Sequence, residues 1–378
     1  MSHEPQCYVE RAEKGFFSQL EAKILALDPK STFATGTMTY NTTFVRRYFP
    51  PDKEGGFAKT LYYHVCDDGR DKADELGLIF FGEICPASMG TMLSAKGNHY
   101  TGKYPKPIDD NTVVKDILVL RTLTGGTTVL NDAYENQLFT LEEILEEDRN
   151  EREKYNSNLN VTGFFATPND ESGRPTDDRI LIKITLPQKY RVPPDVQKTI
   201  LKSQRTRTKK NLLQPKSEDD GMSDPETLRD PTENQSPAIE VGRFYPLEML
   251  PDHRGDYFQQ EHAKLVQLEM LDTDEKLIPP WEAYDKLRVG TVVLVETTLV
   301  CWHIPDHAGG SGTTKKLVYQ VQGHRLRILS ESDELVEPRD IPAPIRPSTE
   351  PTSTTSPRKK PSSAFTEFQS PSKKLRHD

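Results

Sequence analysis

Basic and aromatic residues are interleaved in three segments of this sequence, and such a combination could bind single-stranded nucleic acid. Aromatic faces stack on unpaired bases, while lysine and arginine side chains follow the phosphates. The segment 96–106 is the richest, because it combines two tyrosines, three lysines and two glycines. The other two segments are 44–49 and 324–327. The candidate contacts are Arg46, Arg47, Lys96, Tyr100, Lys103, Arg325 and Arg327.

The distribution of charge opposes this interpretation. The chain of 378 residues has a net charge of −9. Residues 337–378 contain eight basic and five acidic side chains, a net of +3, which leaves −12 for the rest of the chain. A body with this charge repels duplex DNA unless its basic groups converge in one groove. Single-strand binding is therefore an alternative hypothesis and not the leading one.

Metal-binding and catalytic patterns are weaker still. Cys301, His303 and His307 form a partial ligand set, but a structural zinc site needs four ligands and no fourth is evident. The short motifs of phosphate-binding loops, zinc proteases and serine hydrolases do not occur. The sequence therefore predicts no catalytic, cofactor-binding or metal-binding residues. An enzyme with an unfamiliar site is a third hypothesis.

The last forty residues contain a bipartite basic pattern. Two lysines are followed, after twelve residues, by two further lysines and an arginine, a spacing that resembles what nuclear import receptors read on an extended chain. The surrounding proline-rich composition predicts that the pattern is accessible. We therefore expect nuclear localisation through an import receptor. The residues of this signal are Lys359, Lys360, Lys373, Lys374 and Arg376.

Two serines beside these basic clusters indicate regulation. Ser356 and Ser370 each precede a proline and lie close to lysine or arginine, which resembles the consensus of cyclin-dependent kinases. Each phosphate would add about −1.5 to −2 charges. Residues 356–377 carry six basic side chains and one glutamate, a net of +5. Two phosphates would cancel most of that charge, so phosphorylation is expected to weaken import.

Composition limits the cell compartment. The four cysteines are scattered without a paired spacing, which predicts reduced thiols inside the cell. The first residues contain no apolar run of the kind found in secretory signals. No stretch approaches the ~20 apolar residues needed to span a bilayer. We therefore expect a soluble intracellular protein without a membrane segment.

Composition also divides the chain into four parts. Residues 193–239 contain no aromatic residue and hold a basic block followed by an acidic block, which predicts a disordered insertion. Residues 337–378 alternate proline with serine and threonine, which predicts a disordered basic tail. Residues 1–192 should form a globular α+β body. Residues 240–336 should add a helix and a long β-hairpin to the same body, since a lone hairpin is not stable.

Hydrophobic periodicity predicts the elements of this body. Helices are expected at 9–27, 141–155 and 256–271. Thr140 and Glu143 match a capping box, which places the start of the second helix directly after residue 140. Strands are expected where β-branched and aromatic residues cluster between turn residues. They are 33–49, 60–66, 77–85, 113–121, 160–166, 179–186, 287–304 and 317–329.

These features predict an α+β fold with about three helices and a mainly antiparallel sheet that could close into a barrel. The leading functional hypothesis is a nuclear, non-enzymatic protein with a phosphorylation-regulated tail, whose body recognises a protein partner. The alternative is a single-strand-binding protein with an OB-like barrel, since a long hairpin suits the wall of such a barrel.

Overall fold

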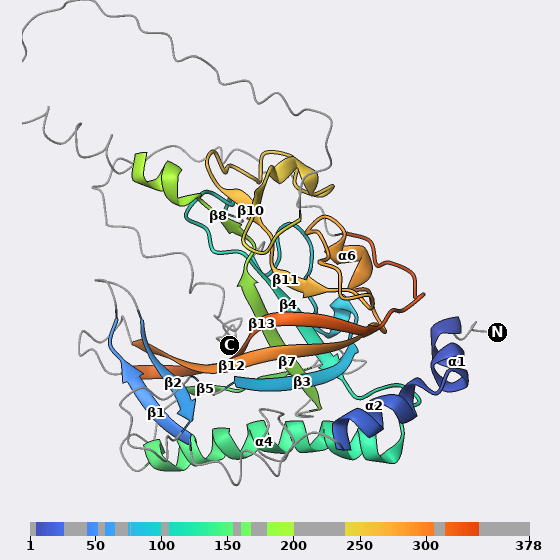
Figure 1. The fold of residues 1–378 in the computed structure, drawn as a ribbon. Helices are drawn as coiled ribbons and strands as arrows, with labels where there is room; N and C mark the ends of the chain where they lie inside the picture. The colour runs from blue at the N-terminus through green and yellow to red at the C-terminus, as the bar shows by residue number, and fades with distance from the viewer. Residues whose placement is uncertain are drawn as a thin grey trace, which may run out of the picture.

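The protein is an α+β structure organised around one large mixed sheet (Figure 1). The computed structural model describes residues 5–25, 44–51, 57–64, 75, 77–99, 106–153, 160–167, 180–199, 239–305 and 314–339. The import signal, both serines of the tail, Tyr100 and Lys103 lie outside these residues. The expected disorder of the insertion and tail concerns mainly residues 200–238 and 340–378, which are also outside, and stays a prediction. Residues 194–199, at the start of the insertion, are helical.

Within the described residues, ten strands form the large sheet, and its longest members come from the C-terminal part of the chain. The order along the main path is β1-β2-β12-β3-β4-β7-β13-β11, with β5 paired to β13 and β6 to β7. The strand bounds are β1 Phe44–Phe49, β2 Ala58–His64, β3 Gly77–Ile84, β4 Lys115–Arg121, β5 Asn160–Thr162, β6 Phe165–Ala166, β7 Leu181–Gln188, β11 Glu269–Leu271, β12 Val292–Pro305 and β13 Thr314–Ser330.

The sheet is less uniformly antiparallel than the sequence predicts. Strand β13 pairs in parallel with β5, β7 and β11, whereas β12 pairs antiparallel with β2, β3 and β13. The pairings β12–β3–β4–β7–β13–β12 form a circuit. Two residue pairs join β3 to β4, and two join β7 to β13. These junctions are too short to make a clear barrel wall, so the barrel expectation is not shown.

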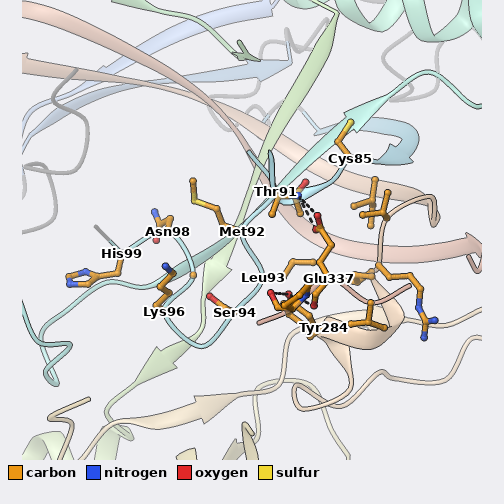
Figure 2. A pocket seen from close by; sticks show the side chains of 18 residues that line it. Cys85, Thr91, Met92, Leu93, Ser94, Lys96, Asn98, His99, Tyr284 and Glu337 are labelled. Carbon is orange, nitrogen blue, oxygen red and sulfur yellow. Dashed lines mark hydrogen bonds between the residues drawn. The ribbon is translucent and has the colours of Figure 1, made fainter. Parts of the chain in front are cut away.

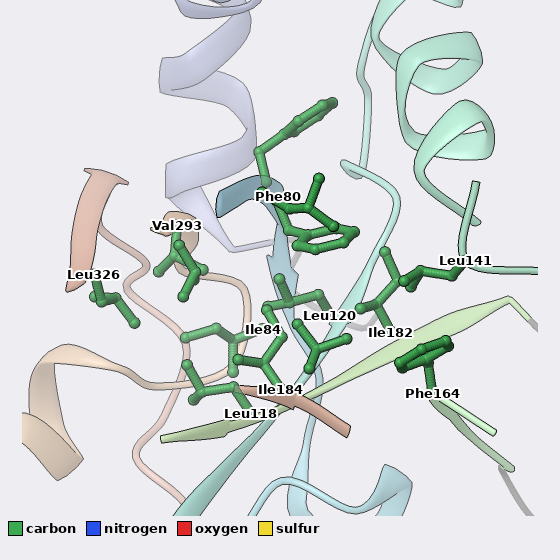
Figure 3. Close-up of a cluster of buried hydrophobic side chains, with 14 of the residues drawn as sticks. Phe80, Ile84, Leu118, Leu120, Leu141, Phe164, Ile182, Ile184, Val293 and Leu326 are labelled. Carbon is green, nitrogen blue, oxygen red and sulfur yellow. The ribbon is translucent and has the colours of Figure 1, made fainter. Parts of the chain in front are cut away.

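The main hydrophobic core lies between the strands of this circuit and the helices that cover them. Phe80, Ile84, Leu118, Leu120 and Ile184 are fully buried, and Figure 3 shows them packed together with side chains from β12 and β13. Burying a Leu, Ile or Phe side chain stabilises a fold by about 1.5–3 kcal/mol relative to exposure. Strands distant in sequence are therefore held together chiefly by this core.

The long helix α4 (Thr128–Glu153) is attached to the sheet by buried polar side chains as well as apolar ones. Gln137 accepts a hydrogen bond from the backbone N–H of Phe81 (2.8 Å) and donates one to its carbonyl (3.1 Å). The amide thus satisfies both backbone groups of Phe81, as a neighbouring strand would. Asp148 accepts hydrogen bonds from Tyr62 and Arg46, and so ties α4 to β2 and β1.

Three helix predictions need correction. The helix expected at 9–27 is two helices, α1 (Gln6–Glu13) and α2 (Phe16–Leu25), separated at Gly15, whose φ is 64°. The helix expected from residue 141 begins at Thr128, so Thr140 is an interior residue of α4. Its position is fully buried. The capping role belongs to Thr127, whose hydroxyl oxygen accepts the backbone N–H of Leu130 at 3.3 Å.

The third expected helix, 256–271, is replaced by turns and two short strands. These are β10 (Lys264–Val266) and β11. The carboxylate of Asp110 accepts backbone N–H groups from 261, 262 and 263, which holds this segment in a non-helical path. Strand β10 lies between β8 (Tyr190–Arg191) and β9 (Phe244–Tyr245) in a separate three-stranded sheet. Figure 1 shows this small sheet on the side of the large sheet away from α4.

Candidate functional site

A cleft of about 420 Å³ lies between the chain that follows β3 and two segments from the C-terminal part of the body. The first wall contains the end of β3, the short helix η1 (Ala87–Met89) and the loop 91–99. The second wall is 284–289, which overlaps α6 (Ala283–Lys286). The third is the extended segment 336–338, which we call the strap. Figure 2 shows side chains from these segments gathered around one space.

Buried polar groups fix the loop that forms the first wall. The Lys189 ammonium donates hydrogen bonds to the carbonyls of Leu93 (3.1 Å) and Ser94 (2.9 Å). The Tyr190 hydroxyl donates to the Ala95 carbonyl (2.6 Å), and the Asp252 carboxylate accepts the Ala95 N–H (2.6 Å). With three consecutive residues held in this way, the wall is preformed.

Gly97 is required by the path of the same loop. Its φ is +47°, and a Cβ atom there would lie 2.5 Å from the carbonyl oxygen of Lys115. The loop therefore packs against β4 at a distance that only glycine allows.

The strap is held on the cleft by its own polar groups. The Glu337 carboxylate accepts the Ala87 N–H (2.9 and 3.2 Å), and the Tyr284 hydroxyl donates to the Glu337 carbonyl (3.0 Å). The next arginine, Arg339, stacks on the Tyr284 ring at 4.5 Å and reaches the carboxylates of Asp252 (3.4 Å) and Asp285 (3.3 Å). An extended polypeptide thus already forms one side of the cleft.

Burial shifts the pKa of several titratable side chains that line the cleft. Burial raises the pKa of the Cys85 thiol to about 12, so the nucleophilic thiolate is scarce at neutral pH. Burial lowers the pKa of Lys96, while burial and the Glu337 carboxylate raise that of Tyr284. The His99 ring lies 3.1 Å from the Lys106 carbonyl. The cleft can offer hydrogen-bond donors and apolar contacts to a ligand, but it does not activate Cys85.

The structure places the sequence-predicted nucleic-acid contacts in three parts of the fold. Lys96 lines the cleft. Arg46 and Arg47 are adjacent on β1 and therefore point to opposite faces of the sheet. Arg325 and Arg327 lie on β13 beside β11. Tyr100 and Lys103, as already stated, fall outside the described residues.

Most of these arginines are paired with carboxylates. Arg46 contacts Glu147 (3.0 Å) as well as Asp148. Arg325 contacts Glu269 at 2.6 Å and Glu296 at 3.5 Å. Arg327 contacts Glu275 at 2.7 Å. Each pair reduces the positive charge available to phosphate. Arg47 differs, because its guanidinium lies 4.8 Å over the ring of Tyr63.

Histidine and cysteine residues have structural contacts in the part of the chain that the structure describes. His303 Nε2 lies 2.8 Å from the Thr60 hydroxyl, and Cys301 is buried. His307, the third member of the possible ligand set, lies outside that part. Among the described residues, no three His, Cys, Asp or Glu side chains are placed to hold a metal ion.

The sequence gives little warning of the cleft. Its walls come from segments nearly 250 residues apart, 84–99 and 336–338. The only signal was the polar, glycine-containing start of the segment 96–106, of which residues 96–99 line the cleft.

Within the described helices, none has the length and apolar character needed to cross a membrane. Comparison with protein-family models, with curated proteins and with solved structures found no match to this chain.

Proposed function

We propose that this protein is a non-enzymatic nuclear binding protein, whose body recognises an extended segment of a partner protein in the cleft. The observation that supports the proposal is the strap. The chain's own residues 336–338 lie along the cleft in an extended path, with the Glu337 carboxylate on the Ala87 N–H and Tyr284 on a strap carbonyl. A partner segment of similar chemistry would take the place of the strap on these groups.

Site-specific cross-linking in the full chain tests this proposal. A photoreactive phenylalanine analogue at Met92, which lines the cleft and is 41% exposed, should capture a partner peptide in nuclear extract. The same analogue at Val9 on α1, which is 46% exposed, is the matched control. A synthetic peptide with the sequence of 331–339 should compete with the capture at Met92. Identical products at both positions, or no competition by the peptide, would contradict the proposal.

The nuclear part of the proposal depends on the tail and is tested separately. Residues 356–378 should carry a fluorescent cargo into nuclei, because they contain both basic clusters. Cytoplasmic retention of the fusion would contradict it. Replacing Ser356 and Ser370 by glutamate should weaken accumulation, since the added negative charge opposes the basic clusters. The matched control replaces both serines by alanine, which should leave accumulation unchanged.

A further inference from the structure

A second surface, which shares no residue with the cleft walls, lies at the end of the large sheet where β1, β2, β12 and β13 run together. Register pairs place Arg47 opposite Leu61, Leu61 opposite Val300, and Lys59 opposite Trp302. Since alternate residues of a strand share a face, these pairs define one face of the sheet. We call it the wing face. It consists of Val45, Arg47, Phe49, Lys59, Leu61, Tyr63, Val300, Trp302, Ile304, Lys316, Val318 and Gln320.

The two faces of this part of the sheet differ in what covers them. On the opposite face, Tyr62 and Arg46 contact Asp148 of α4, and Tyr62 is fully buried. On the wing face, Val45 is 42% exposed and Arg47 is exposed, whereas Val300 and Val318 form a buried floor. Phe49, Tyr63 and Trp302 are half-buried above that floor. The wing face therefore presents aromatic edges and cations to its surroundings.

Charge on the wing face is mainly positive. The twelve residues include three cations, Arg47, Lys59 and Lys316, and none of the twelve is acidic. Glu75, which forms an isolated bridge with Tyr63, adds one carboxylate at the edge of the face. Arg47 lies over Tyr63 at 4.8 Å, and the Lys59 ammonium lies 6.0 Å from the Trp302 ring. A cation held by an aromatic face keeps its full positive charge. This positive area is unusual in a protein whose residues 1–336 carry −12.

The aromatic rings are arranged around these cations. Phe49 and Tyr63 have ring centroids 6.4 Å apart, next to Arg47. The Trp302 Nε1–H donates a hydrogen bond to Gln320 at 3.0 Å, which fixes the orientation of the indole ring. Rings at fixed positions interleaved with cations match what a single strand needs, namely stacking surfaces for bases and charge for phosphates. An acidic peptide would use the cations but would leave the three rings without a counterpart.

We propose that the wing face binds single-stranded nucleic acid, with Arg47 and Lys59 contacting phosphates and with Phe49, Tyr63 and Trp302 contacting bases. This function is separate from the cleft and does not depend on it. Of the residues suggested by the sequence, Arg47 is retained in this proposal. Arg46, Arg325 and Arg327 form ion pairs, and Lys59 and three aromatic residues take their place.

Fluorescence anisotropy of the full chain with a labelled oligothymidylate tests the charge component. The probe should have about 20 nucleotides, which exceeds the roughly 4–16 nucleotides that single-strand-binding folds cover. In the double variant Arg47→Ala/Lys59→Ala, the slope of log affinity against log salt should fall by about 1.4, since each phosphate contact on a single strand contributes about 0.7. The basic tail is present in every protein compared, so its contribution cancels.

A conservative change tests the stacking component. Phe49→Leu keeps an apolar side chain on the face but removes the ring, and should weaken binding about five-fold or more with an unchanged salt slope. Trp302→Ala should have the larger effect, up to about a hundred-fold. A thermal melt of each variant distinguishes lost binding from lost folding. Arg325→Ala is the matched control, because this arginine lies on β13 but contacts Glu269 and Glu296, and it should bind like the unaltered protein.

Several results would overturn the proposal. The first is the absence of binding to the probe at about 10 μM protein and low salt. The second is an affinity for duplex equal to that for the single strand. The third is a loss of affinity in the control Arg325→Ala equal to that in the wing-face variants. Unchanged binding in Arg47→Ala/Lys59→Ala would assign any affinity to the tail. Binding of polyglutamate in place of the oligonucleotide, with the same dependence on Arg47 and Lys59, would assign the face to acidic peptides.

Discussion

Glu83 and Asp116 are carboxylates with almost no exposed surface, on neighbouring strands of the same sheet, yet they have very different surroundings. Glu83 accepts hydrogen bonds from Tyr8, from two nitrogens of Arg121, and from the hydroxyl and backbone N–H of Thr124. The Arg11 guanidinium lies 3.9 Å away. Glu83 thus connects α1 to β3 and β4 through several donors at once.

Among the described residues, the Lys189 ammonium at 2.6 Å is the one cation paired with Asp116. Burial raises the pKa of Asp116 to about 6, and the attraction of Lys189 only partly opposes that rise. One contact at short distance therefore does not replace a full set of donors, because desolvation of a carboxylate is opposed by every hydrogen bond that it accepts. Four measurements test this difference between the two carboxylates.

The largest effect is expected at Glu83. Glu83→Gln would leave Arg11 and Arg121 without their shared carboxylate, and breaking a buried ion pair costs about 3–5 kcal/mol. We expect a loss near the upper end, about 5 kcal/mol, in urea unfolding at pH 7. The control is Glu331→Gln, since Glu331 pairs with Lys286 while 44% exposed, and an exposed pair contributes less than about 1 kcal/mol. Equal losses in the two variants would remove the special role of Glu83.

Lys189→Met should cost somewhat less, about 3 kcal/mol at pH 7. The variant removes the cation beside Asp116 and the donors to the carbonyls of Leu93 and Ser94. Asp116 already has a pKa raised to about 6 and can take up a proton. The loss should therefore be smaller at pH 5 than at pH 7. A loss that is the same at both pH values would show that Asp116 does not titrate in this range.

Asp116→Asn isolates the titration itself. The folded-state pKa of about 6 lies above the ordinary value of 3.8, so the contribution of Asp116 to stability is complete below about pH 4 and is lost as the pH rises through 6. Across that interval, the unaltered protein should lose about 2–3 kcal/mol relative to Asp116→Asn, since each pKa unit corresponds to about 1.4 kcal/mol. Urea unfolding at pH 4, 5, 6 and 7 measures it. A difference in the free energy of unfolding between the two proteins that stays constant with pH would contradict the raised pKa of Asp116.

The smallest effect is expected for Tyr8→Phe, which removes one of the donors to Glu83 at 3.1 Å. A single hydrogen bond to a charged group contributes about 1.5 kcal/mol or a little more, and four other hydrogen bonds to Glu83 remain. Burial and the nearby carboxylate raise the pKa of Tyr8 to about 12, so the loss should not vary between pH 6 and 9. A loss as large as that of Glu83→Gln would mean that the donors do not act additively.

The local sequence pattern predicted most strands. It failed where contacts with distant residues determine the path of the backbone. The strand expected at 77–85 is β3, and the hairpin expected at 287–304 and 317–329 is β12 and β13, because runs rich in β-branched and aromatic residues between turn residues are typical of strands. The helix expected at 256–271 is absent because Asp110, about 150 residues earlier, binds three of its N–H groups. No local rule contains that contact.

Which candidate contacts can act together also depends on distant residues. The sequence analysis grouped Arg46 with Arg47, but alternation along β1 places them on opposite faces, and only the register with β2 and β12 shows that Arg47 shares a face with Tyr63 and Trp302. The ion pairs of Arg325 and Arg327 with Glu269 and Glu275 join segments about 50 residues apart. Basic residues in a sequence therefore indicate charge, but their neutralisation depends on tertiary contacts.

The pairing of β12 with β2 and β3 has a consequence for how the chain is made. Leu61 pairs with Val300 and Phe80 with Val295, so strands near the N-terminus have no partner from β12 until the ribosome has synthesised about 300 residues. At about 5–20 residues per second, that delay is on the order of tens of seconds. During this time the edges of β2 and β3 are open to unwanted pairing. Folding of this protein is therefore expected to be mostly post-translational, and its yield should depend on chaperones that hold the nascent N-terminal half.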